Sequence, residues 1–221
     1  MKAMILAAGR GDRLRPLTDT TPKPLLQTGQ HKLIEYHLYN LANAGFKDVV
    51  INVAWLGEQI INTLGDGSHY QLNIEYSNEG EQALETGGGI FNALPLLGDE
   101  PFLVINGDIW TDYPFRQING FTPGSLAHLI LVNNPEHNPD GDFYLDDHTL
   151  AESGEHKYTF SGIGVYKKDF FDGQTNESFP LAPLIRKHIK QNHISAELYT
   201  GEWDDIGTIE RLDSRIKKQT R

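Results

Sequence analysis

The residues best suited to chemistry begin directly after the first strand-like segment of the chain. Residues 7–13 form a turn of small and charged residues, Ala-Ala-Gly-Arg-Gly-Asp-Arg. Small residues let backbone amides approach a ligand closely, and such amides bind anions. Arg13 adds a positive charge inside the turn, and Lys23 adds another between two prolines that restrict its backbone. The pattern predicts a phosphate site. The competing interpretation is a structural turn with solvated cations.

This turn matches neither of the two common phosphate-binding fingerprints. A P-loop needs Gly-x-x-x-x-Gly-Lys-Ser/Thr, which the chain lacks. A dinucleotide fingerprint needs a third glycine where Leu14 follows Gly9 and Gly11. The turn therefore predicts a different kind of phosphate-binding protein.

Two acidic stretches supply carboxylates for a metal. Asp108 follows a buried apolar strand and Asn106-Gly107, at the end of a strand where open α/β sheets bind ligands. Asp205 lies in Trp203-Asp204-Asp205-Ile206-Gly207-Thr208, before a predicted helix. One or two carboxylates together with substrate phosphates are enough for Mg²⁺. Asp204 is the less favoured ligand, because neighbours in an extended segment point to opposite sides. The alternative is that both acids cap a turn or helix.

A third candidate region lies between these two features. Asn78 and Glu79 follow a predicted strand, and Glu85 precedes Gly87, Gly88 and a further glycine. Consecutive glycines before a helix permit close backbone approach to a ligand. A flexible hinge without a ligand explains the same glycines equally well.

The elements that must position these residues alternate along the first half of the chain. Strands separated by helix-length segments predict βαβ units, a parallel sheet and an α/β fold. The predicted strands are residues 2–6, 48–53, 72–76 and 102–105, and the predicted helices are 33–44, 56–64 and 89–97.

The second half is less regular. Residues 133–157 are polar and rich in proline, glycine and acids, which predicts a hairpin or lid beside the sheet. Further strands are predicted at 127–132, 162–166 and 196–200, and further helices at 181–191 and 209–218.

Composition excludes several classes of protein. The chain has 221 residues and no cysteine, so neither disulfides nor cysteine-based zinc sites can form. Its net charge of −11 argues against nucleic-acid binding, which needs many cations. The apolar runs are too short to span a membrane, and no signal peptide is recognisable, so we expect a cytoplasmic protein.

Taken together, the motifs resemble those of the sugar-phosphate nucleotidyltransferase family. The matching stretches are Leu-Ala-Ala-Gly-x-Gly-x-Arg-Leu-x-Pro-Leu-Thr, Pro-Lys-Pro-Leu, Asn-Gly-Asp and Trp-x-Asp-x-Gly-Thr. Asp12 stands where this family more often has threonine, which puts an acid beside the expected triphosphate. The resemblance implies a Rossmann-like, mostly parallel mixed sheet flanked by helices, with a small sugar-binding lobe. It also implies Mg²⁺ as cofactor, with a nucleoside triphosphate and a sugar 1-phosphate as substrates.

The resemblance assigns a role to each candidate residue. Arg13 would hold the outer phosphates, Lys23 would reach the reacting phosphates, and Asp108 and Asp205 would bind the metal; Arg13, Lys23 and Asp108 are the expected catalytic residues. The nucleotide is expected at Leu6, Ala7, Ala8, Gly9, Gly11, Asn78, Glu79, Gly87 and Gly88. The sugar phosphate is expected at Glu85, Asn106, Asp142 and Gly162. For Gly162, a core strand with small residues is the competing interpretation.

A narrower resemblance concerns the substrates. Glu-Thr-Gly-Gly-Gly, Asn-Gly-Asp-Ile-Trp-Thr-Asp and Gly-Asp-Phe resemble the short N-acetylmuramate-1-phosphate uridylyltransferases of bacterial cell-wall recycling. This implies UTP and N-acetylmuramate 1-phosphate. GTP with mannose 1-phosphate, dTTP with glucose 1-phosphate, and a non-catalytic nucleotide-sugar sensor stay open. A sensor would usually lack an acid or the lysine.

The chain is expected to form one domain over residues 1–221. Residues 1–112 would mainly bind the nucleotide, 113–200 the sugar, and 201–221 would hold the second metal segment and a closing helix. A sugar phosphate is already an anionic nucleophile, so catalysis would rest on positioning and charge neutralisation rather than on a general base. The pattern does not distinguish a monomer from a dimer.

Overall fold

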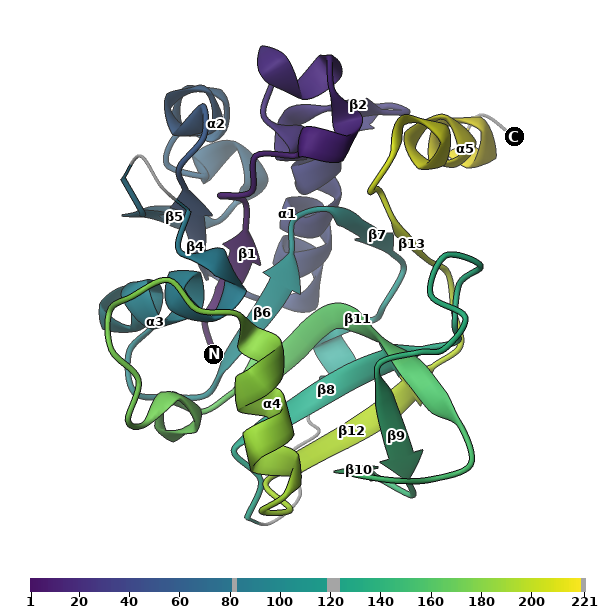
Figure 1. Ribbon diagram of the computed structural model, residues 1–221. Coiled ribbons are helices and arrows are strands. Elements are labelled where there is room, and N and C mark those ends of the chain that lie inside the picture. The colour runs from purple at the N-terminus through teal and green to yellow at the C-terminus, as the bar shows by residue number, and fades with distance from the viewer. Residues whose placement is uncertain (81–82, 119–123, 220–221) are drawn as a thin grey trace.

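A nine-stranded mixed sheet runs through the whole chain in the computed structural model, which describes residues 1–80, 83–118 and 124–219 (Figure 1). The strand order is β5-β4-β1-β6-β11-β8-β12-β10-β9. These strands are β1 (Ala3–Leu6), β4 (Asp48–Val53), β5 (Asn73–Asn78), β6 (Phe102–Asn106), β8 (Ala127–Val132), β9 (Phe143–Asp146), β10 (Thr149–Ala151), β11 (Lys157–Tyr166) and β12 (Ile194–Tyr199).

The first half of this sheet is parallel, as its alternating strands and helices predict. Strand β1 pairs in parallel with β4 and β6, and β4 pairs in parallel with β5. Leu6 lies opposite both Asn52 and Asn106, so three strands end side by side. Parallel strands bring their carboxyl ends to one edge of the sheet, where ligands bind in such folds. The mixed α/β fold expected from the sequence is confirmed.

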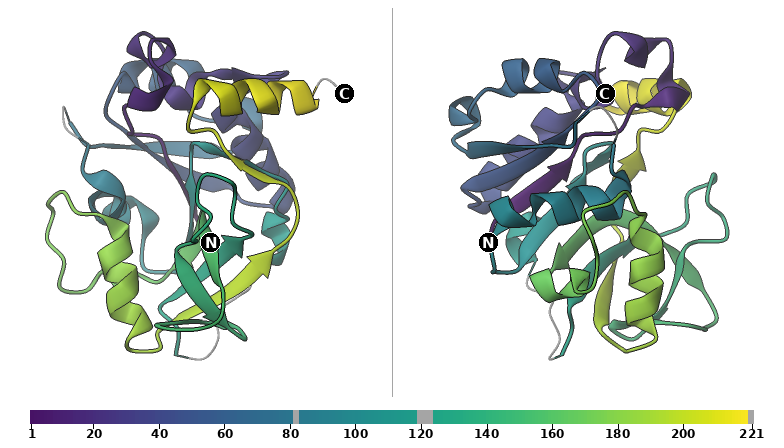
Figure 2. Two further views of the ribbon diagram at one scale, coloured as in Figure 1. Left: turned by 45° about the vertical axis from the view of Figure 1, so that its right-hand side comes forward. Right: turned by 60° about the vertical axis from the view of Figure 1, so that its left-hand side comes forward.

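The second half continues the sheet with mixed strand directions. Strand β11 is antiparallel to β6 and β8, and β12 is parallel to β8. Strands β9 and β10 form the hairpin predicted in the polar stretch, and they pair with β11 and β12 (Figure 2). The hairpin is therefore hydrogen-bonded to the main sheet and extends it.

Five helices and two small ribbons complete the described part of the fold. The helices are α1 (Leu33–Ala44), α2 (Gly57–Leu64), α3 (Glu85–Leu97), α4 (Leu181–Ile189) and α5 (Ile209–Gln219). The ribbons pair β2 (Gln27–Thr28) with β3 (His31–Lys32) and β7 (Ile109–Thr111) with β13 (Trp203–Asp205). None of these helices is long and apolar enough to cross a membrane.

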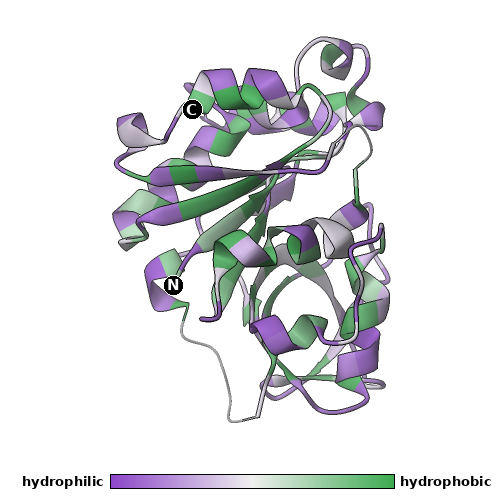
Figure 3. Ribbon diagram, turned by 90° about the vertical axis from the view of Figure 1, so that its left-hand side faces the viewer, coloured by the Kyte–Doolittle hydropathy of each residue, from purple (hydrophilic) through white to green (hydrophobic). Residues whose placement is uncertain are grey.

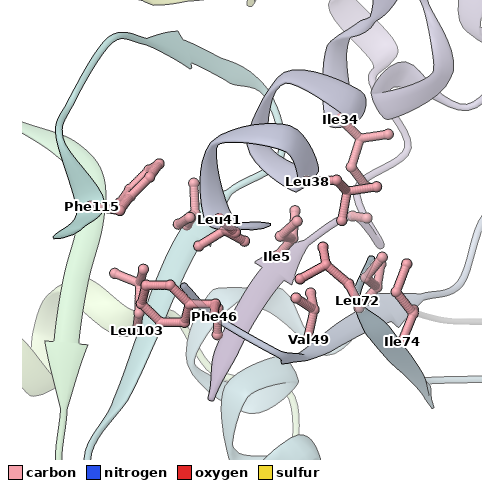
Figure 4. Packing of buried hydrophobic residues seen from close by; sticks show 14 of the residues in the cluster. Ile5, Ile34, Leu38, Leu41, Phe46, Val49, Leu72, Ile74, Leu103 and Phe115 are labelled. Atoms are coloured by element: carbon pink, nitrogen blue, oxygen red, sulfur yellow. The ribbon is translucent and has the colours of Figure 1, made fainter. Parts of the chain in front are cut away.

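Apolar side chains pack on both faces of the sheet. The hydropathy colouring of the ribbon shows that the strands are rich in hydrophobic residues (Figure 3). Successive residues of a strand point to opposite faces. Thus Ile5 of β1 packs with Leu38 and Leu41 of α1 (Figure 4). Its neighbour Met4 packs with Ile90 of α3 on the other face. The two cores hold the strand ends rigidly in place.

Helix α3 begins earlier than its sequence pattern predicts. The prediction put its start at residue 89, but it begins at Glu85, so all three glycines lie within its first turns. A Cβ atom at Gly87 would collide with the Phe179 ring, and one at Gly88 would collide with the Glu177 backbone oxygen. The glycines therefore allow the segment before α4 to pack directly on α3, a contact that no local pattern reveals.

Candidate functional site

A cleft of about 400 Å³ opens where the parallel strands end. Its walls come from the turn after β1, the ends of β4 and β6, the start of α3 and the segment before α5. The cleft is lined by Leu6, Ala7, Ala8, Gly9, Gly11, Asp12, Arg13, Leu14, Lys23, Pro24, Asn52, Glu79, Ala83, Glu85, Thr86, Asn106, Gly107, Asp108 and Gly207.

This cleft brings together most of the residues that the sequence singled out. Both predicted catalytic cations and Asp108 line it. So do Leu6 at the end of β1, four further predicted residues in the turn (Ala7, Ala8, Gly9 and Gly11) and, beyond the turn, Glu79, Glu85 and Asn106. The predicted residues outside the lining are Asn78, Gly87, Gly88, Asp142, Gly162 and Asp205.

A short ion pair lies at the floor of the cleft. Lys23 is held in a 3₁₀ turn after Pro22, and its side chain is only 9% exposed. Its Nζ donates to Oδ2 of Asp108 at 2.6 Å. Asp108, just beyond β6, is 39% exposed and faces the cleft. A largely buried ammonium needs an anionic partner, and Asp108 supplies it at the cleft.

The second acidic stretch lies beside the first. The pairing of β7 with β13 places Asp205 opposite Ile109, and the backbone N–H of Ile206 donates to the Asp108 carbonyl at 2.8 Å. Oδ2 of Asp205 accepts from Arg211 of α5, and its Oδ1 lies 3.0 Å from Nε2 of His137. The two aspartates thus come from adjacent segments.

Asp204 points elsewhere, as the alternation of side chains predicts. Its carboxylate accepts from Arg215 at 3.1 Å and from Lys218 at 2.9 Å, both on α5. The Arg215 side chain is only 5% exposed and lies over the Trp110 ring, 3.3 Å from its centroid. Asp204 therefore anchors α5 against the rest of the fold.

The turn after β1 has a geometry that requires glycine at one position. Gly11 has φ +72°, and a Cβ atom there would lie 2.9 Å from Cγ2 of Thr18. The Thr18 hydroxyl donates to the Gly11 carbonyl at 2.8 Å and holds the turn closed. The backbone conformation, and not the cleft alone, explains this glycine.

The unusual Asp12 is neutralised by its neighbours. Its Oδ1 lies 3.0 Å from Nη2 of Arg15 and 3.7 Å from Nε of Arg10. Arg10 also lies over the Trp55 ring, 4.4 Å from its centroid. Two guanidinium groups thus offset the charge of Asp12 beside the cleft.

Sequence reasoning missed Asn52, which joins three parts of the site. Its Oδ1 accepts from the Ala7 N–H at 2.7 Å, and its Nδ2 donates to Oε1 of Glu79 at 2.6 Å. The other Glu79 oxygen accepts from the Leu84 N–H at 2.7 Å. A Cβ atom at Gly89 would collide with Oε1 of Glu79, so that glycine allows the approach. The sequence offered one signal for Asn52, namely a polar residue near the end of the mostly apolar β4.

The predicted sugar-side residues are Gly162, which lies within β11, and Asp142, which lies directly before β9 and is hydrogen-bonded to β11. Gly162 lies at a bulge of β11 with φ +81°, and a Cβ atom there would lie 2.5 Å from Nδ2 of Asn106. Oδ2 of Asp142 accepts from the Phe160 N–H at 2.8 Å, and its Oδ1 accepts from Asn138. Gly162 thus leaves room for the Asn106 side chain. Asp142 connects the 133–142 loop to the sheet through its hydrogen bonds.

Asn78 and Gly87 also have structural partners. Oδ1 of Asn78 accepts from the Gly80 N–H at 2.8 Å, and this residue lines a separate shallow groove with Val53 and Gly57. Gly87 packs on Phe179, as described above. Their role toward a nucleotide stays a prediction.

His37 lies beneath the site, fully buried on α1. Burial lowers the pKa of His37 to about 4, and the Ile109 backbone and the Asp108 charge offset this only in part. The ring is therefore neutral at physiological pH and adds no charge behind Asp108.

Comparisons with known proteins agree on one family. Residues 2–220 match the family described as nucleotidyl transferase. The chain is 54% identical over 220 residues to an N-acetylmuramate alpha-1-phosphate uridylyltransferase of Neisseria meningitidis serogroup B, covering 96% of this chain and 95% of the relative. It is 40% identical to a mannose-1-phosphate guanyltransferase of Saccharomyces cerevisiae, over 100% of this chain and 55% of that protein.

A solved structure gives the same result for the fold. A protein from Bacillus anthracis described as a glucose-1-phosphate thymidylyltransferase has a TM-score of 0.87 at 21% identity, covering 99% of this chain and 95% of that one. The cleft, its cation–carboxylate pairs and the match over nearly the full length therefore lead to one assignment. The chain belongs to the nucleotidyl transferase family.

Proposed function

We propose that this chain transfers a uridylyl group from UTP to N-acetylmuramate 1-phosphate, forming the UDP-sugar and releasing pyrophosphate. The observation that carries the proposal is the 54% identity, over nearly the full length of both chains, to a uridylyltransferase of this specificity. The guanyltransferase of yeast is less similar and much longer, which favours UTP over GTP as the nucleotide substrate.

The cleft offers a phosphate-binding surface next to a pair of acids. Residues of the 7–13 turn line the cleft, where Arg13 and Lys23 add positive charge. These groups would hold the triphosphate. The base would lie against the end of β4 and the start of α3, where the bonded pair Asn52 and Glu79 fixes the wall of the cleft. Residues 1–112 would thus mainly bind the nucleotide, while residues 113–200 would mainly bind the sugar.

The two aspartates fit a divalent cation. Each carboxylate is held by a basic side chain, Asp108 by Lys23 and Asp205 by Arg211, and the two segments are joined by the Ile206 N–H. Within residues 1–80, 83–118 and 124–219 no group of three or more His, Cys, Asp or Glu could hold a metal. Two carboxylates completed by substrate phosphates suit Mg²⁺. When bound, Mg²⁺ would neutralise the charge of the reacting phosphates.

The chain's own residues would position the two substrates and offset their negative charges. The phosphate oxygen of the sugar attacks the α-phosphorus of UTP, and the bond from that phosphorus to the bridging oxygen of the β-phosphate breaks. Pyrophosphate leaves opposite the incoming oxygen. No proton has to be removed, because the attacking phosphate is already ionised. Lys23 and Arg13 bring the two polyanions together and stabilise the negative charge that develops during transfer.

A substrate matrix tests the proposal. Pyrophosphate release with Mg²⁺ is measured for UTP, ATP, GTP, CTP and dTTP, each against the 1-phosphates of N-acetylmuramate, N-acetylglucosamine, glucose and mannose. We expect strong turnover for UTP with N-acetylmuramate 1-phosphate, which would place the enzyme in peptidoglycan recycling. Turnover with another pair would keep the family and mechanism but refute these substrates. Nucleotide binding without any turnover would favour a sensor instead.

A further inference from the structure

Two arginines from distant parts of the chain meet at Gly207. Arg13 comes from the turn after β1, and Arg211 comes from the first turn of α5. A Cβ atom at Gly207 would collide with Nη2 of Arg211 and would lie 3.3 Å from Nη2 of Arg13. Both guanidinium groups thus lie over the bare backbone of Gly207, which itself lines the cleft.

The charges of these two groups are poorly balanced. Arg13 is exposed and makes no hydrogen bond or ion pair with another residue in the described part of the chain. Arg211 has an acidic partner, Asp205, and also contacts His137, with 2.9 Å between its Nη1 and Nε2 of the imidazole. Two guanidinium groups side by side repel one another unless an anion lies between them, and a phosphate is the anion whose oxygens match their donors.

The partner of Arg211 is also the predicted second metal ligand. An Asp205 carboxylate that turns toward a divalent cation gives up much of its interaction with Arg211. The guanidinium is then available to a substrate at the moment when the metal site is filled. The Arg211 and Asp205 side chains are each 23% exposed, so both can change partner without unpacking the core.

We propose that Arg211 is a further substrate-binding residue, which together with Arg13 binds a phosphate group of a substrate over Gly207 once Asp205 engages the divalent cation. The inference rests on the proposed function, because it assumes a phosphorylated substrate in this cleft. The phosphate can belong to the nucleotide or to the sugar, and both sources present the same chemistry to the two arginines.

Four variants separate this role from a structural one. Arg211→Met removes the guanidinium, and Arg211→Lys keeps the charge without the two-pronged geometry. Gly207→Ala adds a methyl group where the two arginines converge, at the flexible ends of their side chains. Lys218→Met is the matched control, since it removes one cation from the same helix but breaks a pair with Asp204.

Calorimetry gives the decisive measurement on the full chain. The ligands are UTP, and then N-acetylmuramate 1-phosphate and N-acetylglucosamine 1-phosphate in the presence of Mg²⁺ and a UTP analogue with a methylene between its α and β phosphorus atoms. Binding of Mn²⁺ alone is measured in parallel. Loss of a charge-assisted contact should weaken phosphate binding about 10- to 100-fold in Arg211→Met. Arg211→Lys should recover part of this, Gly207→Ala should weaken the same ligand, and Lys218→Met should bind normally.

The pattern of lost affinities shows which substrate supplies the phosphate, or it overturns the proposal. A loss for UTP alone assigns the phosphate to the nucleotide, and an equal loss for both sugar phosphates assigns it to the sugar; either supports the proposal. A loss for N-acetylmuramate 1-phosphate alone would mean that Arg211 reads its carboxylate, which overturns a phosphate site. Weaker Mn²⁺ binding with unchanged phosphate ligands would make Arg211 only a positioning residue for Asp205. Mn²⁺ should instead bind at least as tightly to Arg211→Met, because a competing cation has gone.

Failure of the proposed function would show in a different measurement, the substrate preference of the wild-type protein. Wild-type protein that turns over another sugar phosphate refutes N-acetylmuramate 1-phosphate as substrate. The Arg211 comparison would then be repeated with the substrate found. A melting temperature within a few degrees of wild type for each variant shows that the binding changes do not reflect misfolding.

Discussion

At the scale of single residues, the site rests on a few cation–carboxylate pairs. Lys23 with Asp108 and Arg211 with Asp205 each combine a cation suited to phosphate with an acid suited to metal. Such pairs hold the four side chains near the cleft before substrates arrive. The sequence identified three of these four residues, because they lie in short motifs.

Replacing Asp108 by asparagine should lower kcat about 100- to 1,000-fold, because the metal loses a charged ligand and Lys23 loses its anion. Steady-state kinetics with Mg²⁺ measures the effect. Asp99→Asn is the control, since Asp99 is an exposed acid paired with Lys168 at 2.6 Å, away from the cleft. Near-normal turnover in Asp108→Asn would refute the metal assignment.

Replacing Asn52 by alanine should destabilise the protein by about 1–3 kcal/mol, because the Ala7 N–H and the Glu79 carboxylate both lose a partner. The KM for UTP should also rise, since the Glu79 wall loosens. Urea denaturation and initial rates measure the two effects. Asn92→Ala, which removes a 3.1 Å bond to Ser77 from α3, serves for comparison. An unchanged KM would show that the network supports only the fold.

At the scale of elements, glycines perform two different tasks. A Cβ atom at Gly9 meets nothing within 4 Å and would project from the turn that lines the cleft. A Cβ atom at Gly87 would meet Phe179 instead. The same residue type thus leaves space for a ligand at one element and for a packed ring at another.

Alanine substitutions should separate these tasks. Gly9→Ala should keep the melting temperature of wild type while weakening UTP binding at least tenfold, because the added methyl group takes up space in the phosphate turn. Gly87→Ala should destabilise the fold by about 1–3 kcal/mol through overpacking. The double variant with Phe179→Ala should recover part of the loss at Gly87. Thermal melts and UTP titrations measure both. Equal melting temperatures for the two single variants would contradict this division.

At the scale of the whole molecule, one continuous sheet joins the parallel strands at the cleft to the mixed strands of the second half. Strand β1 leads into the turn of residues 7–13, and the β9–β10 hairpin extends the sheet at its other end (Figure 1). His37 of α1 is fully buried near Asp108 and Ile109, so the stability of this part of the fold depends on its remaining neutral.

Acid should therefore destabilise the fold through His37. Its pKa is about 4 in the folded chain and about 6.5 when unfolded, so the unfolded chain binds more protons between these values. The contribution of neutral His37 to the free energy of unfolding is complete above pH 6.5 and is lost as the pH falls toward 4. At pH 5 the loss should be about 2 kcal/mol relative to pH 7.5.

Urea denaturation at pH 7.5 and pH 5 tests this, with His37→Met compared with wild type. The variant should lose less stability on acidification than wild type does. His156→Met, at an exposed position, should behave like wild type. An unchanged pH dependence in His37→Met would show that other groups cause the acid sensitivity.

The sequence by itself determined the local elements and the motif residues. Periodicity predicted α1 and β4 with the bounds that the structure has, because each presents one regular apolar pattern to a core. The fold class followed from the alternation of such patterns. The turn, Lys23, Asp108 and Asp205 followed from residue types and spacing together with the resemblance they carry.

Only the tertiary structure decided which distant groups meet. Asn52 and Glu79 lie 27 positions apart, and His137 reaches Asp205 from a different loop. Arg211 looks like an ordinary helix surface residue until α5 packs beside Gly207. Local patterns record which face of an element is apolar, but a polar contact between elements depends on how the completed sheet and its helices bring their ends together.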